Sequence, residues 1–306
     1  MTNTGAGINS AAIEQRIAVR PYATRVGVEI DGVDLSRELD DGSFGRIRDA
    51  FYRHSLLVIR GQDITPAQQI RFTRRFGEIQ MHHLTQYVLP EHPEVLVLSN
   101  IEENGKTIGL ADAARVAVWH TDLSYLKEPV AASTLYAVEV PYNDKGEALG
   151  DTVFTSTFAA YDALPAEMKT RLAGLKAIHR MTKGGYEKDK DGSVSRLRFS
   201  AEQKKNFQDV MHPIVRTHPV TGRKCLYVNP MATDGIEGMS DDEGTALLDT
   251  LYAQCTRPEF TYSHHWRKGD LLMWDNCSGL HIAIMDYALP QRRRMHRITI
   301  KGSAPF

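Results

Sequence analysis

The sequence is poor in cysteine. Its 306 residues include Cys225, Cys255 and Cys277, and none of the three is spaced as Cys-x-x-Cys. A disulfide framework and a thiolate zinc site are therefore not indicated. We expect the three thiols to behave as small buried hydrophobic groups in a reducing compartment.

Long apolar runs and an excess of either charge are also missing. No stretch approaches the roughly 18 apolar residues of a membrane span, and residues 1–11 lack the basic start and apolar run of a secretory signal. The formal net charge is -1, so no long-range field attracts nucleic acid or an anionic membrane. These absences predict a cytoplasmic protein without nucleic-acid or membrane partners.

What is present is an ordinary globular composition, 42% hydrophobic and 25% charged, with enough length for a sizeable core. Residues 1–16 are rich in Thr, Gly, Asn, Ser and Ala and are expected to form a flexible arm. Residues 17–306 show no repeat and no low-complexity block, which predicts a single domain.

Short strands separated by turns dominate the predicted secondary structure. Capping boxes mark two helix starts, Thr65 with Gln68 and Ser240 with Glu243. Mainly β structure with flanking helices, arranged as an antiparallel sandwich or barrel, is the expected fold class. Strands are expected at 17–19, 27–30, 55–60, 96–98, 134–140, 151–156, 214–217, 225–229, 260–266, 271–274 and 297–301, and helices at 43–53, 66–76, 165–175 and 240–254.

Two polar segments lie between these elements. Residues 102–114 carry two glycines and mixed charge, and they lead directly into the most informative motif of the chain. Residues 183–205 are dense in Gly, Lys, Asp, Ser and Arg. Each segment is either a solvated surface loop or a lid over a binding site, and the sequence leaves both interpretations open.

The most informative motif is Trp119-His120-Thr121-Asp122. In an extended segment, residues two apart point to the same face, so one metal ion could contact both His120 and Asp122. A His-x-Asp triplet also occurs by chance in exposed turns. A metal site therefore needs a third ligand from elsewhere.

A third ligand is available at His281, which follows an apolar strand and the polar turn after Trp274. The adjacent pairs His82-His83 and His264-His265 are weaker candidates, because neighbours in a strand face opposite sides. Two histidines and a carboxylate leave half of an octahedron open, as in non-haem Fe(II) oxygenases. The basic residues 292–294 beyond His281 suit an anionic ligand, since a guanidinium binds a carboxylate in a bidentate manner.

These residues belong to a wider pattern. The chain resembles the Fe(II)/2-oxoglutarate-dependent dioxygenases of the taurine dioxygenase and 2,4-dichlorophenoxyacetate dioxygenase family from about residue 19 to 302. The matching segments, besides the two metal-ligand motifs, are Leu57 to Gln62, Arg75 to Glu78, Gly150 to Thr152, Ala159 to Pro165, Arg216 to Pro219, Gly269-Asp270 and Gln291 to Arg297.

The resemblance implies a double-stranded β-helix (jelly-roll) core in which His120, Asp122 and His281 bind Fe(II). It implies that Thr152 and Arg293 contact the distal carboxylate of 2-oxoglutarate. Reaction with O2 would hydroxylate a small organic anion and give succinate and CO2, with fragmentation of some products. Assembly into homo-oligomers, dimers or tetramers, is usual in such a family.

Substrate recognition is where the chain departs from taurine dioxygenases. By motif position, Arg297 can meet the anionic group of the substrate, and His82 matches a sulfonate-binding histidine. Val116 and Thr85 replace an asparagine and a tyrosine of taurine enzymes. We therefore expect a more apolar pocket for an aryloxyalkanoate or other carboxylate, an alkyl sulfonate or a sulfate ester.

Two other functions fit parts of the sequence. A metal-dependent hydrolase or isomerase on the same barrel would need a further ligand or a general base, a role that His82 could take. A non-catalytic binding module could have kept the fold alone. The complete set of three ligands together with Arg293 favours the dioxygenase.

Overall fold

The computed structural model describes residues 16–82, 84–110, 117–180, 186–188, 194–196 and 209–306. The expected flexible arm at 1–16 thus lies outside the described residues except for Arg16, and most of the polar segment 183–205 lies outside them as well. No helix in the described part of the chain is long and apolar enough to cross a membrane.

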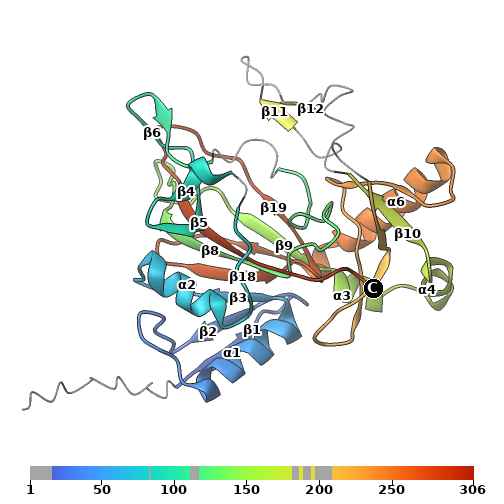
Figure 1. The fold of residues 1–306 in the computed structure, drawn as a ribbon, viewed down its shortest axis with the longest axis horizontal. Coiled ribbons are helices and arrows are strands. Elements are labelled where there is room, and N and C mark those ends of the chain that lie inside the picture. The colour runs from blue at the N-terminus through green and yellow to red at the C-terminus, as the bar shows by residue number, and fades with distance from the viewer. Residues whose placement is uncertain (1–15, 83, 111–116, 181–185, 189–193, 197–208) are drawn as a thin grey trace, which may run out of the picture.

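An eight-stranded sheet forms the centre of the molecule (Figure 1). Neighbouring strands pair antiparallel except β2 and β3, which are parallel. In spatial order the strands are β1 (Ala18–Pro21), β2 (Val28–Asp31), β3 (Leu56–Ile59), β18 (Leu271–Asp275), β8 (Ala132–Glu139), β20 (Arg294–Ile300), β5 (His92–Ser99) and β4 (Val88–Leu89).

A three-stranded sheet carries further residues of the candidate site, and four more sheets of two or three strands complete the β structure of the described residues. The sheet that carries site residues consists of β17 (Thr261–His264), β9 (Thr152–Ser156) and β19 (Gly279–Ala283) in that order. The others combine β13 (Val210–Pro213), β10 (Lys176–His179) and β16 (Thr233–Ile236); β14 (Val215–Thr217) and β15 (Lys224–Leu226); β6 (Glu102–Glu103) and β7 (Lys106–Thr107); and β11 (Tyr186–Lys188) and β12 (Val194–Arg196).

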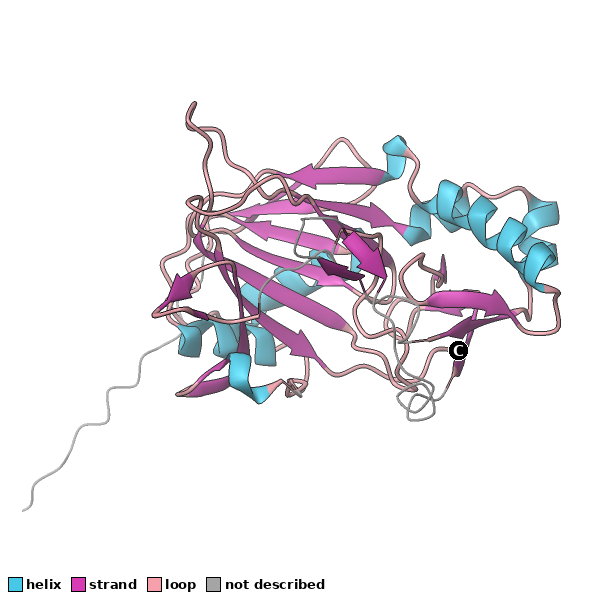
Figure 2. Cartoon of the chain, turned by 90° about the horizontal axis from the view of Figure 1, so that it is seen from above, coloured by secondary structure: helices cyan, strands magenta, loops and turns pink. Residues whose placement is uncertain are grey.

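The helices lie outside the strands (Figure 2). They are α1 (Asp41–His54), α2 (Pro66–Arg74), α3 (Thr157–Asp162), α4 (Ala166–Leu172) and α6 (Asp241–Cys255), with short 3-10 turns η1 (Thr85–Tyr87) and η4 (Pro258–Phe260). Both predicted capping boxes are confirmed, at the N-termini of α2 and α6. The fold is mainly β with flanking helices, as expected.

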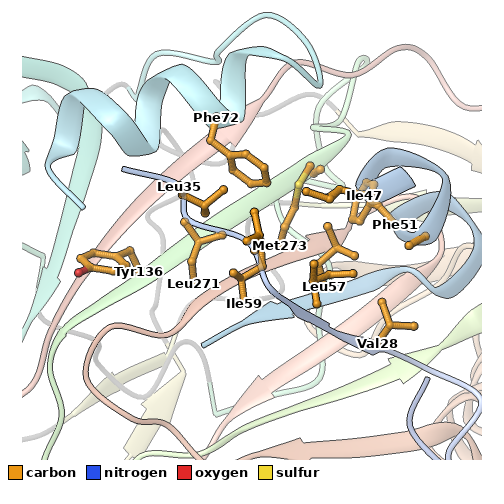
Figure 3. Close-up of a cluster of buried hydrophobic side chains, with 14 of the residues drawn as sticks. Val28, Leu35, Ile47, Phe51, Leu57, Ile59, Phe72, Tyr136, Leu271 and Met273 are labelled. Atoms are coloured by element: carbon orange, nitrogen blue, oxygen red, sulfur yellow. The ribbon is translucent and has the colours of Figure 1, made fainter. Parts of the chain in front are cut away.

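The two faces of the large sheet bury different clusters because side chains alternate along each strand. On β18, Leu271 and Met273 pack against α1 and α2 in the cluster of Figure 3. Leu272 and Trp274 point the other way, into a second cluster that contains Phe154 of β9. The large sheet is therefore covered by helices on one face and by the three-stranded sheet on the other.

Several predicted elements differ from the structure. The expected helix at 165–175 is shorter, because Ala173 has extended backbone angles and ends it. The expected loop at 102–114 contains the hairpin β6–β7, while 111–116 lies outside the described residues. Strands β10 and β19 were not expected, because each is short and contains a buried histidine, which weakens the apolar pattern of a strand.

Candidate active site

His120, Asp122 and His281 converge on one point. Their potential ligand atoms lie within 4.8 Å of one another, and all three residues are buried. His120 and His281 form a β-bridge in which each backbone N–H donates to the carbonyl of the other, at 3.0 and 2.8 Å. His120 is thus held by an isolated bridge rather than within a strand, and a turn begins at Asp122. The predicted grouping of the three residues is nevertheless present.

Both imidazoles are suited to bind a cation. The Nδ1 of His120 lies 2.7 Å from the Val118 carbonyl, and since a carbonyl only accepts, Nδ1 carries the proton and Nε2 keeps its lone pair. Burial, with the nearby His120, lowers the pKa of His281 to about 3, which keeps that ring neutral. The Nε2 of His281 lies 4.0 Å from Asp122 Oδ1.

The carboxylate of Asp122 remains charged at neutral pH. Burial raises its pKa, but the positive charge of Arg297 outweighs that effect, together with that of the two histidines when they are protonated at low pH, and the pKa falls to about 2. Arg297 Nη1 lies 3.4 Å from Asp122 Oδ1. A buried anion beside two neutral imidazoles is an arrangement that a divalent cation stabilises.

A chain of directed hydrogen bonds fixes the orientation of this carboxylate. The indole N–H of Trp274 donates to Asn276 Oδ1 at 3.0 Å, which identifies the other amide atom as the donor. That amide group donates to Ser133 Oγ at 3.0 Å, and the Ser133 hydroxyl donates to Asp122 Oδ2 at 2.7 Å. The other carboxylate oxygen, Asp122 Oδ1, faces His281. Ser133 was not predicted from the sequence, since a small polar residue in a strand carries no recognisable pattern.

Arg293 and Thr152 are the two residues predicted to bind 2-oxoglutarate. Arg293 precedes β20 and is buried, and the ring of Tyr287 lies 5.7 Å from its guanidinium carbon. Gly150, with φ of +75°, approaches so closely that a Cβ there would lie 2.9 Å from Tyr287 and 3.3 Å from Arg293 Nε. Thr152 follows on β9, and its hydroxyl accepts a hydrogen bond from Trp266 Nε1 at 3.1 Å.

The residues predicted to bind the substrate lie in different environments. Arg297 lies directly against Asp122, as described above. His82 is half-buried and accepts a hydrogen bond from the Leu84 amide, and Thr85 is exposed at the start of η1. Val116 lies outside the described residues.

A second buried cluster, His218, Asp275 and Cys277, also has metal-ligand chemistry. The backbone amides of Val220 and Thr221 both donate to His218 Nδ1, so its proton is on Nε2. That proton is donated to Asp275 Oδ2 at 2.8 Å. With no lone pair directed at the cluster, His218 is not a ligand, and the group is a structural hydrogen-bonded pair.

Comparison with characterised proteins yields several relatives of similar length. Pentalenolactone F synthase from Streptomyces arenae is 33% identical over 280 residues, covering 89% of this chain and 91% of the relative. Alpha-ketoglutarate-dependent 2,4-dichlorophenoxyacetate dioxygenase from Cupriavidus pinatubonensis is 32% identical, with coverage of 94% and 99%. Alpha-ketoglutarate-dependent sulfate ester dioxygenase from Pseudomonas putida is 30% identical, with coverage of 100% and 95%.

Several solved structures are also similar to this chain. The crystal structure of AAD-2 in complex with Mn(II) and N-oxalylglycine superposes with a TM-score of 0.78 at 33% identity, covering 94% of this chain and 98% of AAD-2. A taurine dioxygenase described as putative from Burkholderia xenovorans gives 0.77 at 31% identity, with 94% of each chain covered. A model of the taurine catabolism dioxygenase TauD, TfdA family matches residues 18–299, and the chain therefore belongs to this family.

Proposed function

We propose that this 2-oxoglutarate-dependent dioxygenase binds its Fe(II) through His120 Nε2, Asp122 Oδ1 and His281 Nε2. The observation that supports the assignment is the convergence of one buried carboxylate and two imidazoles whose ligand atoms lie within 4.8 Å of one another. Three protein ligands leave positions open for a bidentate 2-oxo acid and O2. Closed zinc sites use four protein ligands instead.

Thr152 and Arg293 are proposed to bind the distal carboxylate of 2-oxoglutarate. A buried guanidinium suits a carboxylate, and the Thr152 hydroxyl can donate to one of its oxygens. Gly150 gives the cofactor pocket room, because any side chain there would meet Tyr287 and Arg293. When bound, iron, 2-oxoglutarate and O2 supply the oxidising power that hydroxylates a C–H bond and releases succinate and CO2.

The proposed substrate is a small organic anion. Arg297, next to Asp122, is placed to meet the anionic group of a substrate near the metal. Relatives are named for a dichlorophenoxyacetate, for sulfate esters and for alkyl sulfates, and a similar solved structure is named for the sulfonate taurine, which supports carboxylates, sulfonates and sulfate esters as the classes to test. Hydroxylation next to an ether or ester oxygen would fragment such a molecule. Val116, Thr85 and His82 are proposed as residues that select among these classes.

We further propose that residues 17–306 form a single domain with a double-stranded β-helix core, and that 1–16 is a flexible arm. The packing of the β17–β9–β19 sheet over the large sheet supports this core. A cytoplasmic homo-oligomer, dimer or tetramer, is proposed from the family resemblance. Analytical ultracentrifugation of the full chain would test its assembly.

The iron assignment is tested by titrating the apoprotein with Fe(II) and 2-oxoglutarate without oxygen. Only the chelate should give a weak visible charge-transfer band, and the variant His120→Ala should lose both the band and succinate formation. Unchanged turnover in His120→Ala would contradict the assignment. A hydrolase or isomerase would turn over its substrate without O2 or 2-oxoglutarate.

The substrate is identified by a screen of aryloxyalkanoates, other carboxylates, alkyl sulfonates and sulfate esters, monitored by succinate formation and product detection. An apolar pocket predicts a preference for aromatic or bulky anions over taurine. Comparable turnover of taurine and aryloxyalkanoates would contradict that expectation.

A further inference from the structure

The indole of Trp266 makes one directed polar contact, with the hydroxyl of Thr152. Trp266 is completely buried, and its Nε1 lies 3.1 Å from Thr152 Oγ1. An indole nitrogen can only donate, so this bond occupies a lone pair of the hydroxyl oxygen. The hydroxyl proton of Thr152 is therefore directed away from Trp266.

Thr152 lies on the face of β9 that meets the candidate site. On β9, Thr152 shares a face with Phe154, whose ring lies 6.0 Å from that of His281 and stacks on it. The Thr152 backbone is paired with His264 and Ala283 on the two neighbouring strands. Among the described residues, Trp266 is the one hydrogen-bond partner of the Thr152 side chain.

Trp266 is itself held rigidly. The ring of His264 packs edge-on against it, with ring centroids 4.7 Å apart. His264 Nε2 lies 3.0 Å from Asp270 Oδ2, which also accepts from Arg60 Nη1 at 2.7 Å. These contacts attach the turn between β17 and β18 to Arg60, which directly follows strand β3, and they hold the indole where it donates to Thr152.

We propose that Trp266 is a positioning residue for 2-oxoglutarate, because its N–H makes the Thr152 hydroxyl a donor toward the distal carboxylate. This inference rests on the proposed function, in which Thr152 contacts that carboxylate. Because the hydroxyl is already oriented, binding of the anion carries no entropic cost for ordering it. Without the indole N–H, the hydroxyl could rotate and its proton would lose this preferred direction.

The test compares Trp266→Phe, Thr152→Val and the double variant by anaerobic titration of the Fe(II)-loaded protein with 2-oxoglutarate, read from the charge-transfer band. Thr152→Val should weaken binding about 10- to 100-fold, as expected for a lost hydrogen bond to a charged group. Trp266→Phe should weaken it about 3- to 10-fold, as expected for the loss of one neutral hydrogen bond that orients the hydroxyl. The double variant should bind no more weakly than Thr152→Val, and KM for 2-oxoglutarate should change more than kcat.

Thr155→Val is the matched control. Thr155 lies on the opposite face of β9, where its hydroxyl donates to the Cys255 carbonyl, so its loss should leave 2-oxoglutarate affinity unchanged. If Trp266→Phe is too unstable to titrate, benzothienylalanine at position 266 removes the N–H while keeping the bicyclic shape, and the same loss of about 3- to 10-fold is expected.

The possible failures are distinguishable. Unchanged affinity on losing the indole N–H, together with weakened binding in Thr152→Val, would overturn the inference and leave the proposed function intact. Additive losses in the double variant would also overturn it, since Trp266 would then act through packing. Unchanged binding in Thr152→Val would overturn the assignment of Thr152, and the absence of a band in the unmodified protein would overturn the proposed function itself.

Discussion

At the scale of single residues, the carboxylate of Asp122 depends on a neighbour that does not touch the proposed metal. Ser133→Ala removes the hydroxyl that donates to Asp122 Oδ2 and leaves that oxygen buried without this donor. We expect the affinity for Fe(II) or Co(II) to fall about 10- to 100-fold, as is usual when a partner of a metal ligand is lost. Metal affinity is measured by competition with a chelator in the absence of oxygen.

The neighbouring residue provides the control. Thr134→Val also removes a buried hydroxyl of β8, but Thr134 faces α2, where it contacts Gln69 and Thr73. This variant should be less stable and still bind metal normally. Equal metal affinities in Ser133→Ala and Thr134→Val would show that Ser133 does not orient the carboxylate.

Some residues of the candidate site could be predicted from the sequence and others could not. His120, Asp122 and His281 are recognisable because their residue types are rare in such spacing and because the family motif surrounds them. Ser133 and Trp266 are not recognisable, since their roles depend on which strands become neighbours. Ser133 lies on β8, which pairs with β18. Asn276 directly follows β18 and donates to Ser133, which completes the hydrogen-bonded chain to Asp122.

At the scale of elements, helix α6 offers a test of the capping pattern predicted from the sequence. Ser240→Ala removes the side chain that accepts from the Glu243 amide, and should lower the free energy of unfolding by about 1 kcal/mol. Thr250→Ala, in the exposed middle of the same helix, should not destabilise the protein, because alanine is the better helix former. Denaturant unfolding of both variants checks the difference, and equal losses would contradict the capping role.

Local sequence patterns predict several helices and strands but not how the strands pair. Caps and alternating apolar residues are local, so α1, α2, α6, β3 and β18 could be found. The order β3-β18-β8-β20 joins segments that lie more than 130 residues apart in the sequence, and no local pattern encodes such pairing. Strand β19 was missed although it carries His281, because its five residues include a glycine and a buried histidine.

At the scale of the whole molecule, buried neutral histidines make stability depend on pH. Burial lowers the pKa values of His212, His264 and His296, that of His296 to about 4 from 6.5. The unfolded chain therefore takes up protons below pH 6.5 that the folded protein does not, and stability falls as the pH is lowered through that range. His296 alone should cost about 2 kcal/mol between pH 7 and pH 5, at about 1.4 kcal/mol per pKa unit.

Denaturant unfolding of the metal-free protein at a series of pH values measures this dependence. His296→Gln cannot take up a proton, so it should lose less stability between pH 7 and pH 5 than the unmodified chain. A pH dependence identical in both proteins would contradict the contribution assigned to His296.

The reciprocal backbone bridge between His120 and His281 has a consequence for how the protein acquires its metal. Two of the three proposed ligands are joined by main-chain hydrogen bonds, so their separation is set by the polypeptide before any ion arrives. Loading is then a simple capture step on an already folded chain, unlike a zinc finger, which folds around its ion. Iron lost to a chelator or to oxidation could accordingly be replaced within the same folded molecule, without unfolding and resynthesis.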